Sequence, residues 1–250
     1  MMQRSLFPEG NSLLLDDHQY IVSMIERHSR WVHPDVFARL PVWCPHIARN
    51  QQLYDAKWTR EYTNTKKTTG ATNPKVEGNI AAGKALVSAL GVQNPKPKNW
   101  TVCHLWGYDD PRFASTTSVV HDPKYYSCVG NMVWLPSALK GMTDTLPSVK
   151  SILRTCAFYL YNWVCEHPSV ECEATAIKSG WVPDYYPSSW PSPANTTLQP
   201  VGLAPVTPAI IAKMERTRRQ IFKNLNDPDL LNYPRDQVTE VLDFWGIVND

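Results

Sequence analysis

One histidine stands inside an otherwise apolar stretch of the chain, Val102-Cys103-His104-Leu105-Trp106. As a strand, this stretch alternates between two faces, so it presents His104 on the same face as Val102 and Trp106. A neutral imidazole, whose reference pKa is about 6.5, can take a proton from water at neutral pH. A lone histidine in an apolar strand is also commonly a structural residue, so the residues that follow must decide between the two roles.

Three polar residues that matter below stand further along the chain: Asn131, Lys140 and Asp144. Asn131 and Asp144 have the oxygen atoms that hard divalent cations prefer, and the charge of Lys140 attracts phosphate. Lys140 and Asp144 are four residues apart, so they share one face if the segment is helical. Asp144 could equally be a helix-end residue that only hydrogen-bonds the turning chain.

The segment after His104 offers alternative ligands, which could instead only shape a loop: Asp109, Asp110, His121 and Asp122. A hydrolase with a Cys-His pair is excluded on geometry. Adjacent strand residues point to opposite faces, so Cys103 and His104 cannot act on one substrate atom.

The apolar pattern predicts the elements that position these side chains. Residues 100–106 are typical of a strand, 107–124 of a long polar loop, and 125–129 of a second strand. From Asn131 through Met142 the pattern indicates a helix, and a longer amphipathic helix follows over 147–164. The expected order is therefore strand, loop, strand, helix, helix.

The N-terminal part contains helical patterns and one polar arm. Helical spacing of apolar residues predicts helices over 21–28, 34–40 and 80–90. Residues 59–75 are polar and without a period, which indicates a loop or mobile arm. Its Lys66 and Lys67 are either solvated or in contact with phosphate.

The C-terminal part begins with a proline-rich segment over 181–208, which is expected to wrap the surface as extended chain. A helix from Pro208 to Leu225 follows, with its cations, Arg216 and Arg219 among them, opposite the apolar side. This basic face is either solvated or a phosphate contact. A final amphipathic helix ends the chain.

These patterns divide the chain into three expected regions. Residues 1–98 form a helical region with the basic arm, 99–166 hold the histidine and the long helix, and 167–250 hold the proline-rich wrap and the last helices. With 250 residues, of which 43% are hydrophobic, the chain can bury a real core.

Charge and cysteine spacing exclude several classes of protein. A formal charge of +2 excludes a histone-like polycation, and no two of the six cysteines have the spacing of a zinc knuckle or a redox motif. The N-terminal residues lack an apolar stretch long enough for a signal peptide or membrane span. We therefore expect an intracellular, cytoplasmic protein without membrane contact.

The ordered combination of residues resembles the ββα-metal motif of the HNH endonuclease superfamily. The resemblance lies in Val102–Trp106 and in Gly130-Asn131-Met132-Val133-Trp134-Leu135-Pro136, followed by Leu139 and Thr143-Asp144, and it covers residues 100–145. It implies an α+β fold, mainly helical, with a central β-hairpin and a following helix. It also implies that His104 is the general base that activates water.

The resemblance implies further roles. Asn131 either orients His104 or binds a divalent ion, Mg²⁺ or Mn²⁺, with Asp144 as a second ligand, and Lys140 contacts phosphate. The expected function is a metal-dependent, restriction-type endonuclease acting on double-stranded DNA, with Lys66, Lys67, Arg216 and Arg219 on the DNA backbone. Such an enzyme could act as a homodimer.

Two departures from the family pattern support an alternative. Cys103 stands where a metal-binding Asp or His is frequent, and Lys140 stands nine residues after Asn131, where a ligand is usual. Thiols suit magnesium poorly, and a charged lysine cannot bind a cation. The alternative is a nucleic-acid-binding protein that keeps the ββα scaffold and does not cleave.

Overall fold

The computed structural model describes residues 17–93, 95–107 and 119–248. Helices hold 46% of the residues and strands 12%, and the strands form two small antiparallel sheets. The expected mixed α+β class is confirmed.

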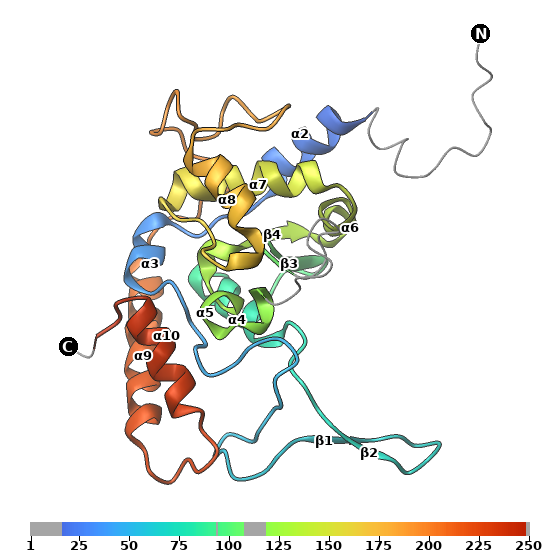
Figure 1. Ribbon diagram of the computed structural model, residues 1–250, viewed down its shortest axis with the longest axis vertical. Coiled ribbons are helices and arrows are strands. Elements are labelled where there is room, and N and C mark those ends of the chain that lie inside the picture. Colours follow the sequence, from blue (N-terminus) through green and yellow to red (C-terminus); the bar gives the residue numbers. More distant parts are fainter. Residues whose placement is uncertain (1–16, 94, 108–118, 249–250) are drawn as a thin grey trace.

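The central sheet pairs β3 (Trp100–His104) with β4 (Met132–Pro136), with His104 opposite Met132. Helix α6 (Ser137–Thr145) begins directly after β4 and packs on both strands, and α7 (Pro147–Tyr161) packs against α6 (Figure 1). The histidine strand is therefore followed along the chain by an antiparallel partner and a helix, as expected.

The position of the second strand differs from the prediction. Residues 125–129, expected to be extended, belong to helix α5 (Pro123–Tyr126) and to the turn before a 3₁₀ helix, η3 (Val129–Asn131). Residues 132–136, expected to be helical, form the strand. Met132 to Leu135 are all buried, and a continuous apolar run has no period that separates a strand from a helix.

The other helices enclose this centre: α2 (His18–His28), α3 (Pro34–Arg39), α4 (Ile80–Ala89), α8 (Glu171–Lys178), α9 (Pro208–Asn226) and α10 (Arg235–Phe244), with short 3₁₀ turns η2 (Val119–His121) and η4 (Pro168–Val170). All but α8 lie where helical spacing predicted them. Local chemistry explains their ends: Thr207 Oγ1 accepts the Ile210 N–H at 3.3 Å at the start of α9, and Gly91, with φ +68°, follows α4.

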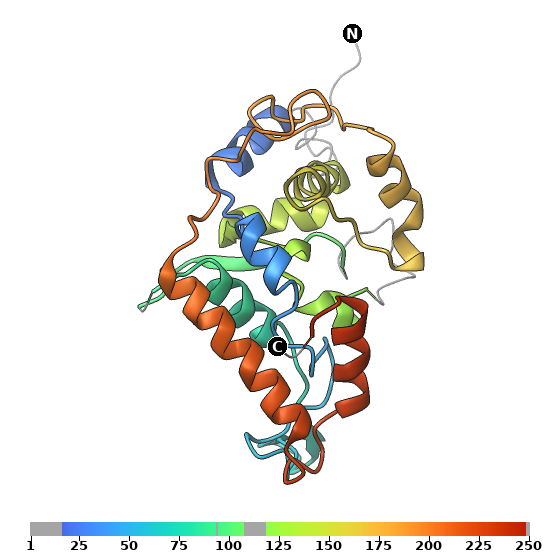
Figure 2. The ribbon, with the colours of Figure 1, turned by 90° about the vertical axis from the view of Figure 1, so that its left-hand side faces the viewer.

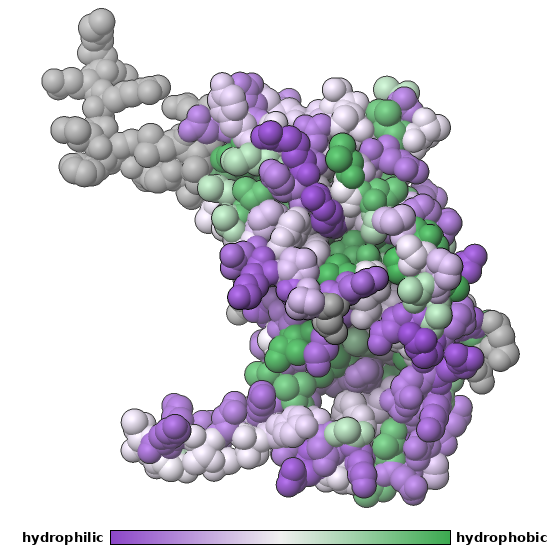
Figure 3. Space-filling view, turned by 180° about the vertical axis from the view of Figure 1, so that it is seen from behind, coloured by the Kyte–Doolittle hydropathy of each residue, from purple (hydrophilic) through white to green (hydrophobic). Residues whose placement is uncertain are grey.

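The polar arm is a hairpin of two short strands, β1 (Thr63–Thr65) and β2 (Thr72–Pro74). It extends sideways from the body in Figure 1 and is white to purple along its length in Figure 3. Every residue of both strands is exposed, so no buried face imposes an apolar alternation that the sequence could have revealed.

One large cluster of buried apolar residues draws on all three regions expected from the sequence, and it includes Trp31, Trp106 and Trp190. A smaller cluster, with Ile221 and Val238, lies between α9 and α10, which meet at their lower ends in Figure 2. Within the described ranges, none of the helices combines the length and the apolar character that a membrane crossing requires.

Candidate active site around His104

His104 lies at the end of β3, and its side chain is only 9% exposed. Its Nε2 is 2.9 Å from the carbonyl oxygen of Tyr126. A carbonyl can only accept a hydrogen bond, so Nε2 carries the proton and Nδ1 keeps its lone pair. Burial lowers the pKa of His104 to about 4, so the imidazole is neutral at physiological pH. This is the tautomer and charge state of a proton acceptor that acts through Nδ1.

Tyr126 holds the imidazole from a second direction. Its ring stacks on that of His104, with the centroids 5.5 Å apart and the planes at 21°. Its hydroxyl donates to Glu77 Oε1 at 2.8 Å, and the same carboxylate oxygen accepts the Ala81 N–H at 3.0 Å in the first turn of α4. The position of His104 is thereby connected to the start of α4.

Asn131 is fully buried, and its amide binds only backbone groups. Its Oδ1 accepts the Trp106 N–H at 2.8 Å, while Nδ2 donates to the carbonyl oxygens of Trp106 at 3.0 Å and Tyr125 at 3.2 Å. These bonds connect the chain just after His104 to the chain just before Tyr126. Of the two roles expected for Asn131, this arrangement supports orientation of the histidine, through the backbone, rather than metal binding.

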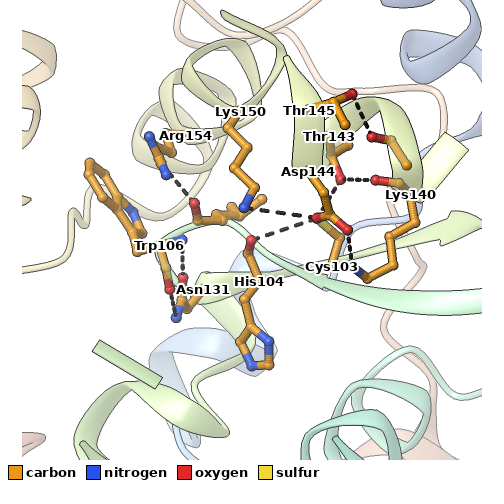
Figure 4. A network of polar contacts seen from close by, with 12 residues as sticks. Cys103, His104, Trp106, Asn131, Lys140, Thr143, Asp144, Thr145, Lys150 and Arg154 are labelled. Carbon is orange, nitrogen blue, oxygen red and sulfur yellow. Dashed lines mark hydrogen bonds and ion pairs between the residues drawn. The ribbon is translucent and has the colours of Figure 1, made fainter. Parts of the chain in front are cut away.

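Asp144 is held between two lysine side chains (Figure 4). Lys140 Nζ forms an ion pair with Asp144 Oδ2, and Lys150 Nζ, from α7, lies 4.0 Å from Oδ1. On the same side of the sheet, Cys103 Sγ is 3.2 Å from Thr143 Oγ1. The Asp144 carboxylate is thus already paired with two cations.

These residues do not fit a magnesium or manganese ion. Such ions need several hard oxygen ligands with negative charge to spare, whereas here the carboxylate of Asp144 is neutralised and the Asn131 oxygen is engaged. In the part of the chain that the structure describes, no three His, Cys, Asp or Glu side chains are grouped to hold a metal. Asp109 and Asp110 lie outside the described residues.

The other two candidate ligands have local partners. His121 Nε2 is 3.2 Å from Asn50 Nδ2. Asp122 Oδ1 accepts the Lys124 N–H at 2.8 Å and so caps α5.

A small cavity lies beside the histidine, and its lining includes Arg49, Asn79, His104, Lys140, Asp144 and Lys150. Its volume is about 10 Å³, which suits about one water molecule. Arg49 Nη1 donates to Asn79 Oδ1 at 3.0 Å. In Figure 4 the imidazole points away from the Asp144 carboxylate, so His104 and the lysine pair form different parts of the cavity wall.

The remaining predicted residues lie elsewhere. Lys66 and Lys67 are exposed on the hairpin, and Arg216 and Arg219 are exposed on α9. None of these four lines the cavity. They therefore lie outside the cavity beside His104.

Several residues of this site were not predicted from the sequence, among them Lys150, Arg49 and Tyr126. Lys150 had a detectable signal, because it stands on the apolar side of α7 at helical spacing from Leu146 and Leu153. Arg49 and Tyr126 had none, since only the tertiary fold brings them to His104.

Comparisons of the chain with protein-family models, with curated proteins and with solved structures gave no match.

Proposed function

We propose that the chain is an endonuclease that hydrolyses DNA phosphodiester bonds, with His104 as the general base. The observation that carries this proposal is the buried, neutral imidazole whose Nε2 donates to the Tyr126 carbonyl and whose Nδ1 is left to accept a proton. Its place on an antiparallel strand pair followed by α6 fits the ββα arrangement that the sequence resembles.

The proposed reaction needs a proton acceptor and positive charge close together. Nδ1 of His104 takes a proton from a water molecule, the resulting hydroxide bonds to phosphorus, and the bond from phosphorus to the leaving ester oxygen breaks. The leaving oxygen takes a proton from solvent, and the imidazolium later releases its proton to solvent. Arg49, Lys140 and Lys150 stabilise the negative charge that develops on the phosphoryl oxygens.

Two basic surfaces support a double-stranded DNA substrate. The hairpin segment from Tyr62 to Val76 contains Lys66, Lys67 and Lys75 and no acidic residue. Helix α9 has four exposed cations on one side: Lys213, Arg216, Arg219 and Lys223. Surfaces that carry several lysine and arginine side chains bind the DNA phosphate backbone without contacts to the bases.

The experiment is nicking of a supercoiled plasmid by the wild type, by His104→Gln and by His28→Gln, with Mg²⁺, with Mn²⁺ and with chelator. His28 is an exposed histidine on α2 and serves as the matched control. General-base catalysis is worth roughly 100-fold or more, so His104→Gln should lose at least that much of the nicking rate while His28→Gln keeps it. An unchanged rate in His104→Gln would exclude His104 as the base.

The pairing of Asp144 with two lysines favours a second candidate, a DNA-binding protein that does not cleave. This candidate predicts a shifted band for duplex DNA in a gel and no nicked plasmid under any of the three conditions. Nicking that His104→Gln abolishes rules it out.

A further inference from the structure

A serine and a histidine outside the site around His104 are hydrogen-bonded to each other. His18 begins α2 and Ser148 stands in the first turn of α7, and His18 Nε2 lies 2.7 Å from Ser148 Oγ. His18 is 5% exposed, whereas Ser148 is half-buried and can be reached from outside. A serine hydroxyl within hydrogen-bond distance of an imidazole is the arrangement that activates a serine as a nucleophile.

The charge and the contacts of His18 suit a base. Burial lowers the pKa of His18, so the imidazole is neutral at physiological pH. Its Nδ1 is buried and has no hydrogen-bond partner among the residues that the structure describes. No contact at Nδ1 therefore opposes the tautomer that carries its proton there, and in this tautomer Nε2 accepts the hydroxyl proton of Ser148.

Tyr185 contacts the imidazole of His18 from an unusual backbone conformation. The two ring centroids are 5.1 Å apart, and the ring planes are at 52°. The φ of Tyr185 is +62°, in the left-handed region that bulky residues seldom adopt. Strained backbone of this kind is concentrated at functional sites, and here it places an aromatic ring against the histidine.

The pair lines a pocket of about 480 Å³, a volume that suits a small-molecule ligand. The lining combines apolar and polar side chains, which are those of His18, Ser148, Ser151, Trp181, Pro183, Asp184 and Tyr185. This set contains no lysine or arginine and has one carboxylate, so it disfavours an anionic substrate and favours a neutral one. The residues that line the cavity beside His104 are all different.

The position of Ser148 also provides donors for an oxyanion. Helix α7 has 15 residues, and no side chain caps its first turn. The first N–H groups of a helix have no carbonyl acceptor within the helix, and they carry partial positive charge. Such groups stabilise negative charge that develops on a carbonyl oxygen bound next to the nucleophile.

We propose that Ser148 and His18 form a catalytic dyad that hydrolyses neutral esters of small apolar acyl groups, as a second activity separate from that of His104. Ser148 Oγ bonds to the acyl carbon while its proton passes to His18 Nε2, and the ester C–O bond breaks as the leaving alcohol takes that proton. A water molecule then gives a proton to Nε2 and bonds to the acyl carbon. The bond to Oγ breaks, Oγ takes the proton back, and the carboxylic acid leaves.

A fluorophosphonate with a fluorescent reporter tests the nucleophile, because its phosphorus bonds to an activated serine oxygen as fluoride leaves. Mass spectrometry should find the label on Ser148 in the wild type and in Ser137→Ala, a control at an exposed serine in the first turn of α6. His18→Gln should be labelled roughly 100-fold more slowly. A wild type without label on Ser148, or equal labelling rates in the wild type and His18→Gln, would overturn the inference.

A second variant, Tyr185→Gly, keeps the role of His18 testable if His18→Gln does not fold. Tyr185 is 60% exposed and glycine adopts a positive φ freely, so this variant is expected to fold. Loss of the ring against His18 should slow the labelling of Ser148 about two- to tenfold. Labelling at the wild-type rate would mean that the placement of the imidazole does not set the reactivity of Ser148, and the inference is wrong.

Hydrolysis of p-nitrophenyl butyrate, measured by the release of p-nitrophenolate, tests the substrate class. The wild type and Ser137→Ala should hydrolyse this ester at the same rate, and Ser148→Ala should lose roughly 100-fold or more of that rate. Equal rates for the wild type and Ser148→Ala would show that Ser148 is not the nucleophile of an esterase.

Discussion

At the scale of the residue, the chemistry of His104 depends on which ring nitrogen carries the proton. The Tyr126 carbonyl holds the proton on Nε2, and burial lowers the pKa to about 4. A base with so low a pKa takes protons weakly. An anionic phosphate bound nearby favours the charged imidazolium and raises this pKa towards the working pH, so substrate binding and base strength are coupled.

The pH dependence of stability provides a test of this environment. The pKa of His104 is about 6.5 in the unfolded chain and about 4 in the folded protein, so the unfolded chain binds its proton first as the pH falls. The contribution of His104 to stability is therefore complete above pH 6.5 and is lost between pH 6.5 and pH 4. This loss lowers the free energy of unfolding by roughly 3 kcal/mol. The free energy of unfolding in urea should therefore fall less on acidification in His104→Gln than in the wild type.

His46 serves as an internal reference for that measurement, because burial also lowers its pKa to about 4. It is present in both proteins, so its contribution cancels in the difference. Parallel curves for the two proteins between pH 6.5 and 4 would mean that His104 titrates normally in the folded state.

Substitution of Asn131 by Asp distinguishes an orienting residue from a metal ligand. The carboxylate keeps an acceptor for the Trp106 N–H but places negative oxygen against the carbonyls of Trp106 and Tyr125. A buried carboxylate oxygen that faces carbonyl oxygens has no hydrogen-bond donor, which lowers the free energy of unfolding by about 1–3 kcal/mol or more. We therefore expect a lower melting temperature for Asn131→Asp. A metal ligand would behave oppositely: Asn131→Asp would bind Mn²⁺ more tightly at unchanged stability.

The resemblance and the residue types together identified part of the site. His104, Lys140 and Asp144 were found in this way, and their spacing places Lys140 and Asp144 on one helical face. The structure pairs these two residues with each other, whereas the sequence led us to expect a metal ligand and a phosphate contact. The bonds of Asn131 could not be predicted, because its partners are backbone groups that only the folded loop presents.

At the scale of the element, amphipathic helices were predictable and the strands were only partly so. Helices α2, α4, α9 and α10 each bury one side, which leaves a 3.6-residue period in the sequence. Helix α7 is buried on all sides from Val149 to Ala157, but its apolar residues still follow the helical period. Strand β4 is buried on both faces and β1 and β2 on neither, so neither case leaves an alternating pattern.

The basic side of α9 should contribute phosphate contacts without base preference. Changing Arg216 and Arg219 to Glu should weaken binding to all duplex sequences and reduce the slope of log affinity against log salt by about 0.9 for each lost contact. The control makes the same charge change at Arg27 on α2 and Lys178 on α8, both exposed. Equal salt slopes for the two double variants would show that α9 is only a solvated surface.

At the scale of the whole molecule, the site joins segments that are far apart in the sequence. Four residues, Arg49, Asn79, His104 and Lys150, meet at one cavity because α4 and α6 pack on the β3–β4 pair and α7 packs on α6. No local pattern encodes such a meeting. The resemblance over residues 100–145 therefore pointed to the histidine, whereas the arrangement of cations around it required the structure.

The most direct test of the account is single-turnover cleavage of an end-labelled DNA duplex, measured together with the affinity for that duplex. With enzyme in excess, the rate reports chemistry and the affinity reports binding. His104→Gln should bind the duplex as the wild type does and cleave it at least 100-fold more slowly. Cleavage by His104→Gln at the wild-type rate, or no cleavage by the wild type itself, would contradict the assignment of His104 as the general base of an endonuclease.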